Sequence, residues 1–316
     1  MTADLYLGLD IGGTKIELAA CDATLAVVHR QRIATPTADF DDFVAQIAAL
    51  VNEAEAGLGR RATAVGLGMP GIVDAISSCQ LSSNVPALNG RHVAPALAAA
   101  LGRPVHMGND CQCFALSEAQ GGAADGLPSM FGAILGTGAG GGYCIGGRLV
   151  TGYNGLAGEW GHWPVPAALL LRHDLPLLDC PCGLRGCLER YVSGSGLATL
   201  YRLRSTSPQN AADAAANAAA VHELAAQGDE AACEALAIHL DLLAQGLAGL
   251  VLVLDPHAIV LGGGLSKLQR LYDELPAAMA RHLFRGARVP PLLPPRFGDA
   301  GGARGAALLA RQRSGA

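Results

Sequence analysis

One histidine and three cysteines in the middle of the chain have the side chains and the spacing of a metal site. The histidine ends the segment Gly158-Glu-Trp-Gly-His162, and the thiols follow at Cys180, Cys182 and Cys187. Three thiolates and one imidazole are the ligand set of a closed, tetrahedral zinc centre. The pattern therefore predicts a structural zinc ion that keeps a neighbouring pocket in shape.

Two carboxylates, Glu159 and Glu189, flank this predicted zinc site. Carboxylates accept hydrogen bonds from sugar hydroxyls, and several polar groups together define a pocket for a polyol. A histidine that binds zinc through one ring nitrogen leaves the other free to orient a hydroxyl. We therefore expect Glu159, Glu189 and His162 to bind a sugar. The alternative is that both glutamates are solvated surface residues.

Asn109 and Asp110 stand between a predicted strand at 104–107 and a predicted helix at 111–120. Either side chain could simply cap the helix, since Asn and Asp are both favoured there. Alternatively, Asp110 is a general base at the carboxyl end of a strand, where open α/β sheets bind ligands. It would accept the proton of a substrate hydroxyl as that hydroxyl attacks the terminal phosphorus of a nucleotide. The residues alone leave both interpretations open.

A glycine-rich turn at 11–15 connects two predicted strands, 5–10 and 16–21. Glycine lets backbone N–H groups approach phosphate oxygens and form an anion-binding nest. Asp10, just before the turn, is placed to hold a magnesium ion through water. The alternative is an ordinary hairpin turn. The candidate cofactor-binding residues here are Gly8, Asp10, Gly12, Gly13, Thr14 and Lys15.

Two further glycine segments strengthen the nucleotide interpretation. Residues 136–142 form the turn of a second predicted hairpin, and Gly262-Gly-Gly264 follows a predicted buried strand at 258–261. Such close backbone approaches suit phosphates, a ribose or the flat face of an adenine. The candidate cofactor-binding residues in these segments are Gly136, Thr137, Gly138, Gly140, Gly262, Gly263 and Gly264.

The elements that carry these residues predict an α/β chain of two domains. A length of 316 residues exceeds the usual size of one core, and the two glycine hairpins suggest two related halves. We expect a small N-terminal α/β domain at 1–115 and a larger C-terminal α/β domain at 116–299. The larger domain carries a zinc-tied insertion at about 156–192. A last helix at about 300–316 is expected to pack back on the first domain.

The composition narrows the possible partners and the compartment. The formal charge is −5 with no run of Lys or Arg, which disfavours nucleic-acid and acidic membrane surfaces. The apolar segment 242–254 is shorter than the roughly 20 residues that span a bilayer, so we expect a buried helix. An odd count of nine cysteines without a signal peptide favours the cytoplasm. The six cysteines outside the predicted zinc site are expected to be small buried side chains.

Together these motifs resemble the ROK family of repressors and kinases over nearly the whole chain. The matching segments are Leu9–Lys15, Gly68–Gly71, Asn109-Asp110, Leu135–Gly138, Gly158–His162, Cys180–Glu189 and Leu261–Gly264. The resemblance implies an actin-like ATPase (ribonuclease H-like) sugar kinase fold of two domains, with the active site in the interdomain cleft. It also implies ATP, Mg²⁺ and a structural Zn²⁺ bound by His162, Cys180, Cys182 and Cys187. It assigns Asp110 as the catalytic base and gives the sugar contacts as Asn84, Asn109, Asp110, Glu159, His162 and Glu189.

Within this family, the chain is most similar to kinases that act on the 6-hydroxyl of N-acetyl-D-glucosamine and release the 6-phosphate and ADP. The segments that carry this likeness are Ser83–Pro86, Asn109–Ala119, Ala287–Pro290 and Gly298–Gly302. The alternatives are another hexose kinase (glucokinase, fructokinase or N-acetylmannosamine kinase) and a non-catalytic sugar sensor. The family's repressors carry an N-terminal DNA-binding extension, whereas here the hairpin begins at residue 5. We therefore expect a small-molecule sugar substrate, no nucleic acid or membrane partner, and a homodimer.

Overall fold

The computed structural model describes residues 4–74, 76–81, 85–206, 218–298 and 301–315. Contacts group the chain into two compact units. Unit 1 comprises residues 1–132, 142–158 and 296–316, and unit 2 comprises residues 133–141 and 159–295. The boundary expected at residue 115 falls inside helix α3 (Asp110–Ala119), within unit 1.

Unit 1 contains a five-stranded sheet with the strand order β3-β2-β1-β4-β7. Its strands are β1 (Leu5–Ile11), β2 (Lys15–Asp22), β3 (Val27–Ala34), β4 (Ala64–Met69) and β7 (Val105–Asn109). β1 pairs antiparallel with β2, which confirms the predicted hairpin, and parallel with β4, which pairs parallel with β7. The central strands are almost continuously buried, as in sheets covered on both faces. The carboxyl ends of β1, β4 and β7 therefore lie at one edge of the sheet.

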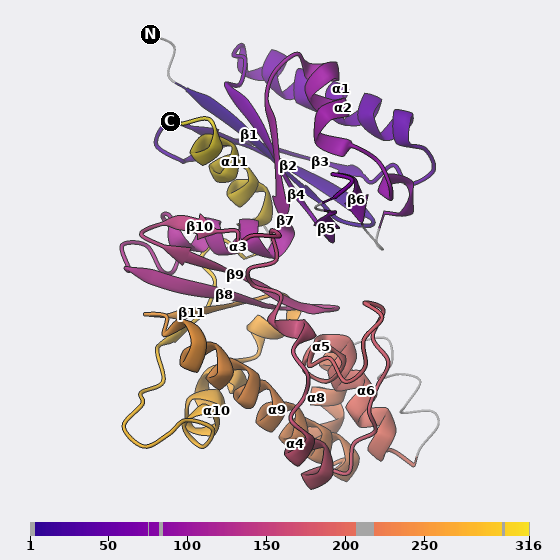
Figure 1. Ribbon diagram of the computed structural model, residues 1–316, viewed down its shortest axis with the longest axis vertical. Coiled ribbons are helices and arrows are strands. Elements are labelled where there is room, and N and C mark those ends of the chain that lie inside the picture. The colour runs from indigo at the N-terminus through magenta and orange to yellow at the C-terminus, as the bar shows by residue number, and fades with distance from the viewer. Residues whose placement is uncertain (1–3, 75, 82–84, 207–217, 299–300, 316) are drawn as a thin grey trace. The chain divides into compact units, whose positions relative to one another are not determined.

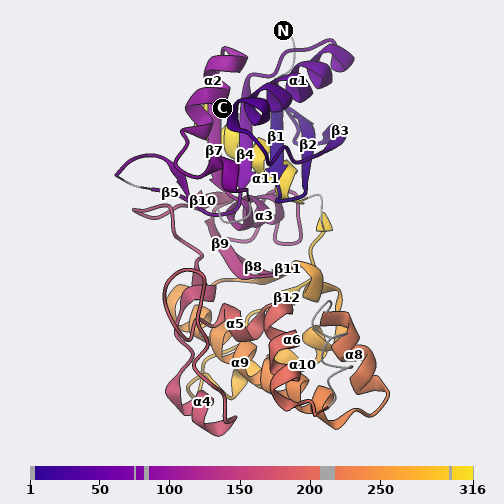
Figure 2. The same ribbon diagram turned by 90° about the vertical axis from the view of Figure 1, so that its right-hand side faces the viewer.

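Helices cover both faces of this sheet. Helices α1 (Phe40–Leu58) and α2 (Val93–Leu101) pack on one face, and α11 (Gly301–Arg313) packs on the other (Figures 1 and 2). Leu5, Leu7 and Leu9 join the apolar core under α1 and α2, whereas Tyr6 contacts Ala307 of α11. This alternation follows from the two-residue period of a strand.

Helix α11 lies directly on the backbone of the sheet and also contacts α3. A Cβ atom on Gly8 would overlap the backbone of Ala303, and one on Gly66 would overlap that of Ala306. Only glycine allows two backbones to approach so closely. The packing of α11 on unit 1 therefore accounts for the glycine at position 8, whose predicted contact with a cofactor stays a prediction.

A second sheet has the order β10-β9-β8-β11-β12, and the boundary between the units passes through β8 and β9. Its strands are β8 (Ser129–Leu135), β9 (Ala139–Ile145), β10 (Arg148–Val150), β11 (Ile259–Gly262) and β12 (Leu292–Leu293). A short hairpin of β5 (Ile72–Val73) and β6 (Gln80–Leu81) belongs to unit 1, as does the 3₁₀ helix η1 (Pro86–Leu88).

The helices of unit 2 surround one long helix, α9 (Glu230–Leu254), which contacts α5, α6, α8 and α10. The other helices are η2 (Trp160–His162), α4 (Ala167–Arg172), α5 (Glu189–Val192), α6 (Gly194–Arg204), α8 (Ala218–Ala226), η3 (Gly264–Lys267) and α10 (Gln269–Ala280). Among the described helices, α9 has the length and apolar composition to cross a membrane, but 61% of that stretch is buried inside the protein. The prediction of a buried helix at 242–254 is confirmed, although Leu252 and Val253 at its end are exposed.

All nine cysteines are free thiols. Outside the predicted zinc site, Cys21, Cys113 and Cys144 are buried, as expected. The expectation is wrong for Cys233, which is exposed, and Cys79 and Cys111 are partly exposed. Apolar neighbours in sequence did not predict burial at these three positions, because adjacent side chains of a helix or turn point in different directions.

Candidate functional site

The four predicted zinc ligands come together in unit 2. One ligand atom from each of His162, Cys180, Cys182 and Cys187 lies within 4.8 Å of all the others. Cys182 Sγ is 3.6 Å from Cys187 Sγ, and Cys180 Sγ is 3.8 Å from His162 Nδ1. Zinc–sulfur bonds of about 2.3 Å in a tetrahedron place two ligand sulfurs about 3.8 Å apart. The donor set and its spacing therefore fit a four-coordinate zinc ion.

A tightly turned segment presents the three thiols. Cys180 N donates to Leu184 O, and the turn passes through Gly183 and Gly186, both with positive φ. Tyr191 ties this segment to α5, since its hydroxyl donates to Pro176 O at 2.8 Å. The insertion thus has few regular elements and depends on such individual bonds together with the cluster of thiols.

The histidine of the cluster uses its two ring nitrogens in different directions. Nδ1 faces Cys180, whereas Nε2 lies 3.7 Å from Glu159 Oε2. Both side chains remain about one-third exposed, at 34% for His162 and 28% for Glu159. The Nε2 edge and Glu159 therefore form a pair of accessible polar groups beside the four-residue cluster, and their role in sugar binding stays a prediction.

Glu189 connects the metal cluster to the turn between β8 and β9. Its Oε2 accepts a hydrogen bond from Ala139 N at 2.9 Å, and its Oε1 lies 3.9 Å from Cys180 Sγ. A Cβ atom on Gly138 would overlap the same carboxylate. The Glu189 carboxylate is therefore held between the predicted zinc site and the second glycine turn.

Trp160 is a residue of this region whose role the sequence did not reveal. Its side chain is buried, and its Nε1–H donates to Gly140 O at 2.8 Å. A buried indole N–H needs an acceptor. Trp160 therefore anchors the start of β9, because the strand already begins at Ala139, within the turn predicted at 136–142. The one signal in the sequence was a large aromatic residue within a polar, glycine-rich segment.

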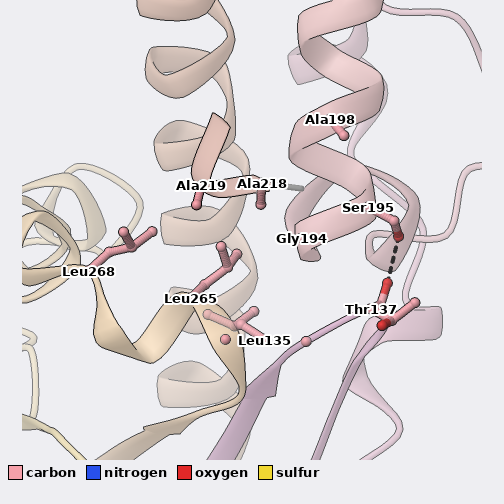
Figure 3. Close-up of a pocket in the computed structure, with 11 residues that line it drawn as sticks. Leu135, Thr137, Gly194, Ser195, Ala198, Ala218, Ala219, Leu265 and Leu268 are labelled. Carbon is pink, nitrogen blue, oxygen red and sulfur yellow. Dashed lines mark hydrogen bonds between the residues drawn. The ribbon is translucent and has the colours of Figure 1, made fainter. Parts of the chain in front are cut away.

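Unit 2 also contains a cavity of about 490 Å³ at the glycine turns (Figure 3). It is lined by Leu135, Gly136, Thr137, Gly194, Ser195, Ala198, Ala218, Ala219, Gly264, Leu265 and Leu268. The Ser195 hydroxyl donates to Thr137 O at 2.5 Å, which joins the start of α6 to the glycine turn. Three predicted cofactor residues (Gly136, Thr137 and Gly264) thus share a cavity with the N-terminus of α6, whose dipole favours anions.

The other predicted cofactor residues do not line this cavity. Gly138 and Gly140 contact Glu189 and Trp160, as described above, and Gly262 and Gly263 lie at the end of β11. The first hairpin belongs to unit 1, where Gly12 N donates to Lys15 O within its turn. Thr14 and Lys15 are exposed there, and Gly13 is partly exposed.

Unit 1 has its own cavity of about 460 Å³ at the carboxyl ends of β4 and β7. Its apolar lining comprises Met69, Gly71, Ile72, Val73, Met107 and Gly108. Its polar lining comprises Gln80, Asn109, Gln112, Thr151, Tyr153, Asn154 and Arg313, and Gly155 completes it. Of the predicted sugar contacts, Asn109 lines this cavity and Glu159, His162 and Glu189 belong to unit 2. Asn84 lies outside the described residues.

The structure shows which of Asn109 and Asp110 caps the helix, and the catalytic role of Asp110 stays a prediction. Asn109 is the N-cap of α3, since its Oδ1 accepts from Cys111 N at 2.8 Å and from Gln112 N at 3.4 Å. Asp110 is the first residue of the helix, and its Oδ1 accepts from Cys111 N at 2.9 Å. Burial raises the pKa of Asp110, partly offset by the bonds to Cys111. A carboxylate with a raised pKa binds a proton more readily than a free one.

Asp10 lies close enough to Asp110 to interact with its charge. Burial first, then the charges of Asp110 and Glu17, raise the pKa of Asp10 to about 7, and Lys15 opposes this shift. The carboxylate of Asp10 lies against the first turn of α11, because a Cβ on Gly302 would overlap it. Oxygen ligands of like charge that approach one another are suited to a hard divalent cation such as Mg²⁺.

A sequence model of the ROK family matches residues 6–313. The chain belongs to the ROK family. The N-acetylgalactosamine kinase AgaK of Shewanella sp. (strain ANA-3) is 47% identical over 305 residues, which cover 96% of each chain. The N-acetyl-D-glucosamine kinase of Photobacterium profundum is 42% identical over 307 residues, which cover 96% of this ROK chain and 99% of the relative.

Solved structures of ROK proteins share the fold. The ROK hexokinase of Thermus thermophilus superimposes with a TM-score of 0.85 at 31% identity. A ROK family glucokinase of Streptomyces griseus, in complex with glucose and AMPPNP, gives a TM-score of 0.78 at 31% identity. Each comparison covers 98% of this chain and 99% of the other. The predicted family and the predicted two-domain, actin-like α/β fold are confirmed.

Proposed function

We propose that this protein transfers the γ-phosphoryl group of ATP to the 6-hydroxyl of N-acetyl-D-glucosamine. The observation that carries this proposal is the unit 1 cavity at the carboxyl ends of β4 and β7, beside the partly buried Asp110. Its apolar members suit an acetyl methyl group, and its amides and hydroxyls suit the polar groups of a sugar. Relatives at 40–42% identity over 96% of the chain are named N-acetyl-D-glucosamine kinases.

Asp110 acts as the general base in this proposal. Its Oδ1 is held by Cys111 N, which leaves Oδ2 to accept the proton of the sugar hydroxyl. The raised pKa of Asp110 brings its basicity closer to that required at neutral pH. Asn109 supports the base by capping the helix that carries it. Asp10 would hold Mg²⁺, which supplies charge neutralisation for the transferred phosphoryl group when bound.

The unit 2 cavity takes the nucleotide. Gly136, Thr137 and Gly264 offer backbone groups, and the N-terminus of α6 offers a positive dipole for phosphate. Leu265, Leu268 and Ala198 give apolar contact area for the base. We assign Zn²⁺ to the four-residue cluster as a structural ion, with Glu159, His162 Nε2 and Glu189 as further sugar contacts.

Two attributes accompany this proposal. We place the protein in the cytoplasm, where a reducing environment keeps a cluster of three free thiols competent for zinc. A homodimer is our expectation from the family resemblance, and light scattering during size exclusion tests it.

A second acceptor, N-acetylgalactosamine, is favoured by the relative at 47% identity. A coupled assay of ADP release should compare N-acetylglucosamine, N-acetylgalactosamine, N-acetylmannosamine, glucose and fructose. We expect the highest kcat/KM with N-acetylglucosamine. A higher value with N-acetylgalactosamine would exchange the two acceptors, and no turnover with any of these sugars would reject the kinase. A sensor would bind sugar equally well with and without Asp110 and would release no ADP.

A further inference from the structure

Residues 151–157, which follow β10, form a closed loop on unit 1. Its ends are joined by a hydrogen bond from Ala157 N to Thr151 O at 3.2 Å, and it turns at Gly152 and Gly155, with φ of 76° and 73°. Residues 152–156 are exposed. Four residues of this 151–157 loop line the unit 1 cavity: Thr151, Tyr153, Asn154 and Gly155. The loop therefore shapes the cavity although little packing supports it.

Gln112 of α3 anchors this loop through two hydrogen bonds. Its side chain is 4% exposed, and its Nε2 donates to Gly155 O at 2.9 Å and to Ala157 O at 3.0 Å. Both partners are carbonyl oxygens, which only accept, so they fix the orientation of the amide. Gln112 is also a lining residue of the cavity. The same helical turn thus carries Asp110 and the anchor of the loop.

Tyr153 is an aromatic residue placed in water at the edge of the cavity. Its side chain is fully exposed, at 102% of the reference area, although it lines the cavity. Covering a water-exposed aromatic ring with an apolar face is favourable, because it removes apolar surface from water. The C–H face of a pyranose ring is such a surface, and it lies within the substrate class already proposed for this cavity.

We propose that Tyr153 is a substrate-contacting specificity residue that stacks on the pyranose ring of the amino sugar, and that Gln112 is the positioning residue that holds it there. This inference rests on the proposed sugar site in unit 1. The neighbouring Asn154 offers an amide to the ring hydroxyls. Recognition of the sugar ring thereby depends on a hydrogen bond pair made two residues from the base.

A double-mutant cycle with Tyr153→Ala and Gln112→Leu tests this inference. We expect Tyr153→Ala to raise the sugar KM about tenfold, a loss of about 1.4 kcal/mol, with kcat and the ATP KM unchanged. Tyr153→Phe should behave as the wild type, because the ring is retained. Gln112→Leu should raise the sugar KM to a similar degree. The double variant should be no worse than the poorer single variant, because Tyr153 contributes nothing once its loop is released.

The chain offers matched controls. Gln120 at the end of α3 donates from Nε2 to Gly147 O, and so anchors a different turn with the same chemistry. Phe284 is an exposed aromatic residue of unit 2. Gln120→Leu and Phe284→Ala should leave the sugar KM unchanged. Melting curves report whether the buried Gln112 variant is folded, and the exposed Tyr153→Ala variant tests the stacking by itself.

The outcomes separate this inference from the proposed function. An unchanged sugar KM in Tyr153→Ala, or fully additive effects in the double variant, would overturn the inference while the kinase stands. If the wild type phosphorylates a different hexose, the proposed substrate is wrong, and the same cycle on that hexose still decides the role of the loop. If no sugar is bound in calorimetry, both proposals fail together.

Discussion

The two cavities of this protein are built from different parts of the chain. The unit 1 cavity presents polar side chains such as Gln80, Asn109 and Asn154, whereas the unit 2 cavity is lined mainly by glycine, alanine and leucine. Side chains can discriminate between the hydroxyls of similar sugars, because each has its own donors and acceptors. Backbone groups and a helix N-terminus bind phosphate of any nucleotide. Under the proposed function, we infer that unit 1 supplies most of the selectivity for the acceptor and that unit 2 supplies the tolerance for the phosphoryl donor.

The largest effect should come from the base in unit 1. Asp110→Asn keeps the shape of the side chain and removes its ability to accept a proton, so kcat should fall by about 10²–10⁴-fold. The sugar affinity, measured by calorimetry, should stay within about threefold of the wild type, because the hydrogen-bonding shape is kept. Asp41→Asn, which changes an exposed aspartate in the first turn of α1, is the matched control. Wild-type kcat in Asp110→Asn would remove the base from the mechanism.

A variant of the predicted zinc cluster tests whether unit 2 also contributes to sugar selectivity. Cys182→Ser removes one of four ligands, and loss of the ion should loosen the segment that positions Glu159, His162 and Glu189. We expect the melting temperature to fall and the sugar KM to rise about tenfold, before the ATP KM changes. Cys233→Ser, at an exposed thiol outside the cluster, should change neither.

Elemental analysis provides the independent check on this prediction. The wild type should contain one zinc per chain, and a clearly lower content would contradict the assignment of the cluster. A rise of the ATP KM ahead of the sugar KM would instead mean that the insertion supports the nucleotide cavity. The contrast between the two cavities would then need a different division of their residues.

Acid should act on the core beside the unit 2 cavity. His239 of α9 donates from Nε2 to Val192 O at 2.8 Å, next to the start of α6, and burial lowers its pKa from 6.5 to about 4. Below pH 6.5 the unfolded chain therefore binds a proton that the folded chain refuses. The free energy of unfolding should fall by about 1.4 kcal/mol per pH unit from pH 6.5 towards pH 4.

Denaturant unfolding of the wild type and of His239→Gln isolates this contribution. Glutamine can donate to Val192 O but does not titrate, so the difference in unfolding free energy between the two proteins should shrink or reverse from pH 7 to pH 5. All other titratable groups are common to the two proteins, so the comparison at equal pH cancels their effect. Parallel curves for the two proteins would show that His239 is not the titrating group.

The predictability of the two cavities from sequence also differs. The clustering of the predicted zinc ligands could be expected because cysteine and histidine are rare and their spacing is local, and Gly136, Thr137 and Gly264 stand in glycine-dense segments. Ala198, Ala218 and Ala219 carry no chemical signal in a chain rich in alanine. Their place in the cavity depends on how α6 and α8 pack.

The same limit applies to unit 1. Gln112 looks like any polar helix residue, and only the fold shows that its amide meets two carbonyls of a loop about 40 residues away. The boundary predicted at residue 115 lies within α3, whereas the division between the units falls inside β8 and β9. The glycine at Gly8 has a local pattern typical of a phosphate loop, yet its tight contact is with α11, about 300 residues away.

Two adjacent glycines at the unit 2 cavity, Gly263 and Gly264, differ in the space around them. Gly264 lines the cavity, and among the described residues no atom other than those of Gly264 and its chain neighbours lies within 4 Å of the position that its Cβ would take. Gly263 has φ of 76°, and its Cβ would lie 2.5 Å from the backbone of Leu135. Gly264→Val should therefore fill cavity space and raise the ATP KM about tenfold, with stability and the sugar KM unchanged. Gly263→Ala should instead lower the melting temperature, because the left-handed backbone and the crowding both oppose a side chain.

The two variants thus distinguish a glycine that borders the cavity from a glycine that the backbone conformation requires. Steady-state kinetics at saturating sugar gives the ATP KM, and thermal unfolding gives the stability of each variant. If Gly264→Val left the ATP KM unchanged, the cavity at α6 and η3 would not hold the nucleotide, and Gly262, Gly263 and Gly264 would have only a structural role. If it raised the sugar KM instead, the division of acceptor and donor between the two units would be reversed.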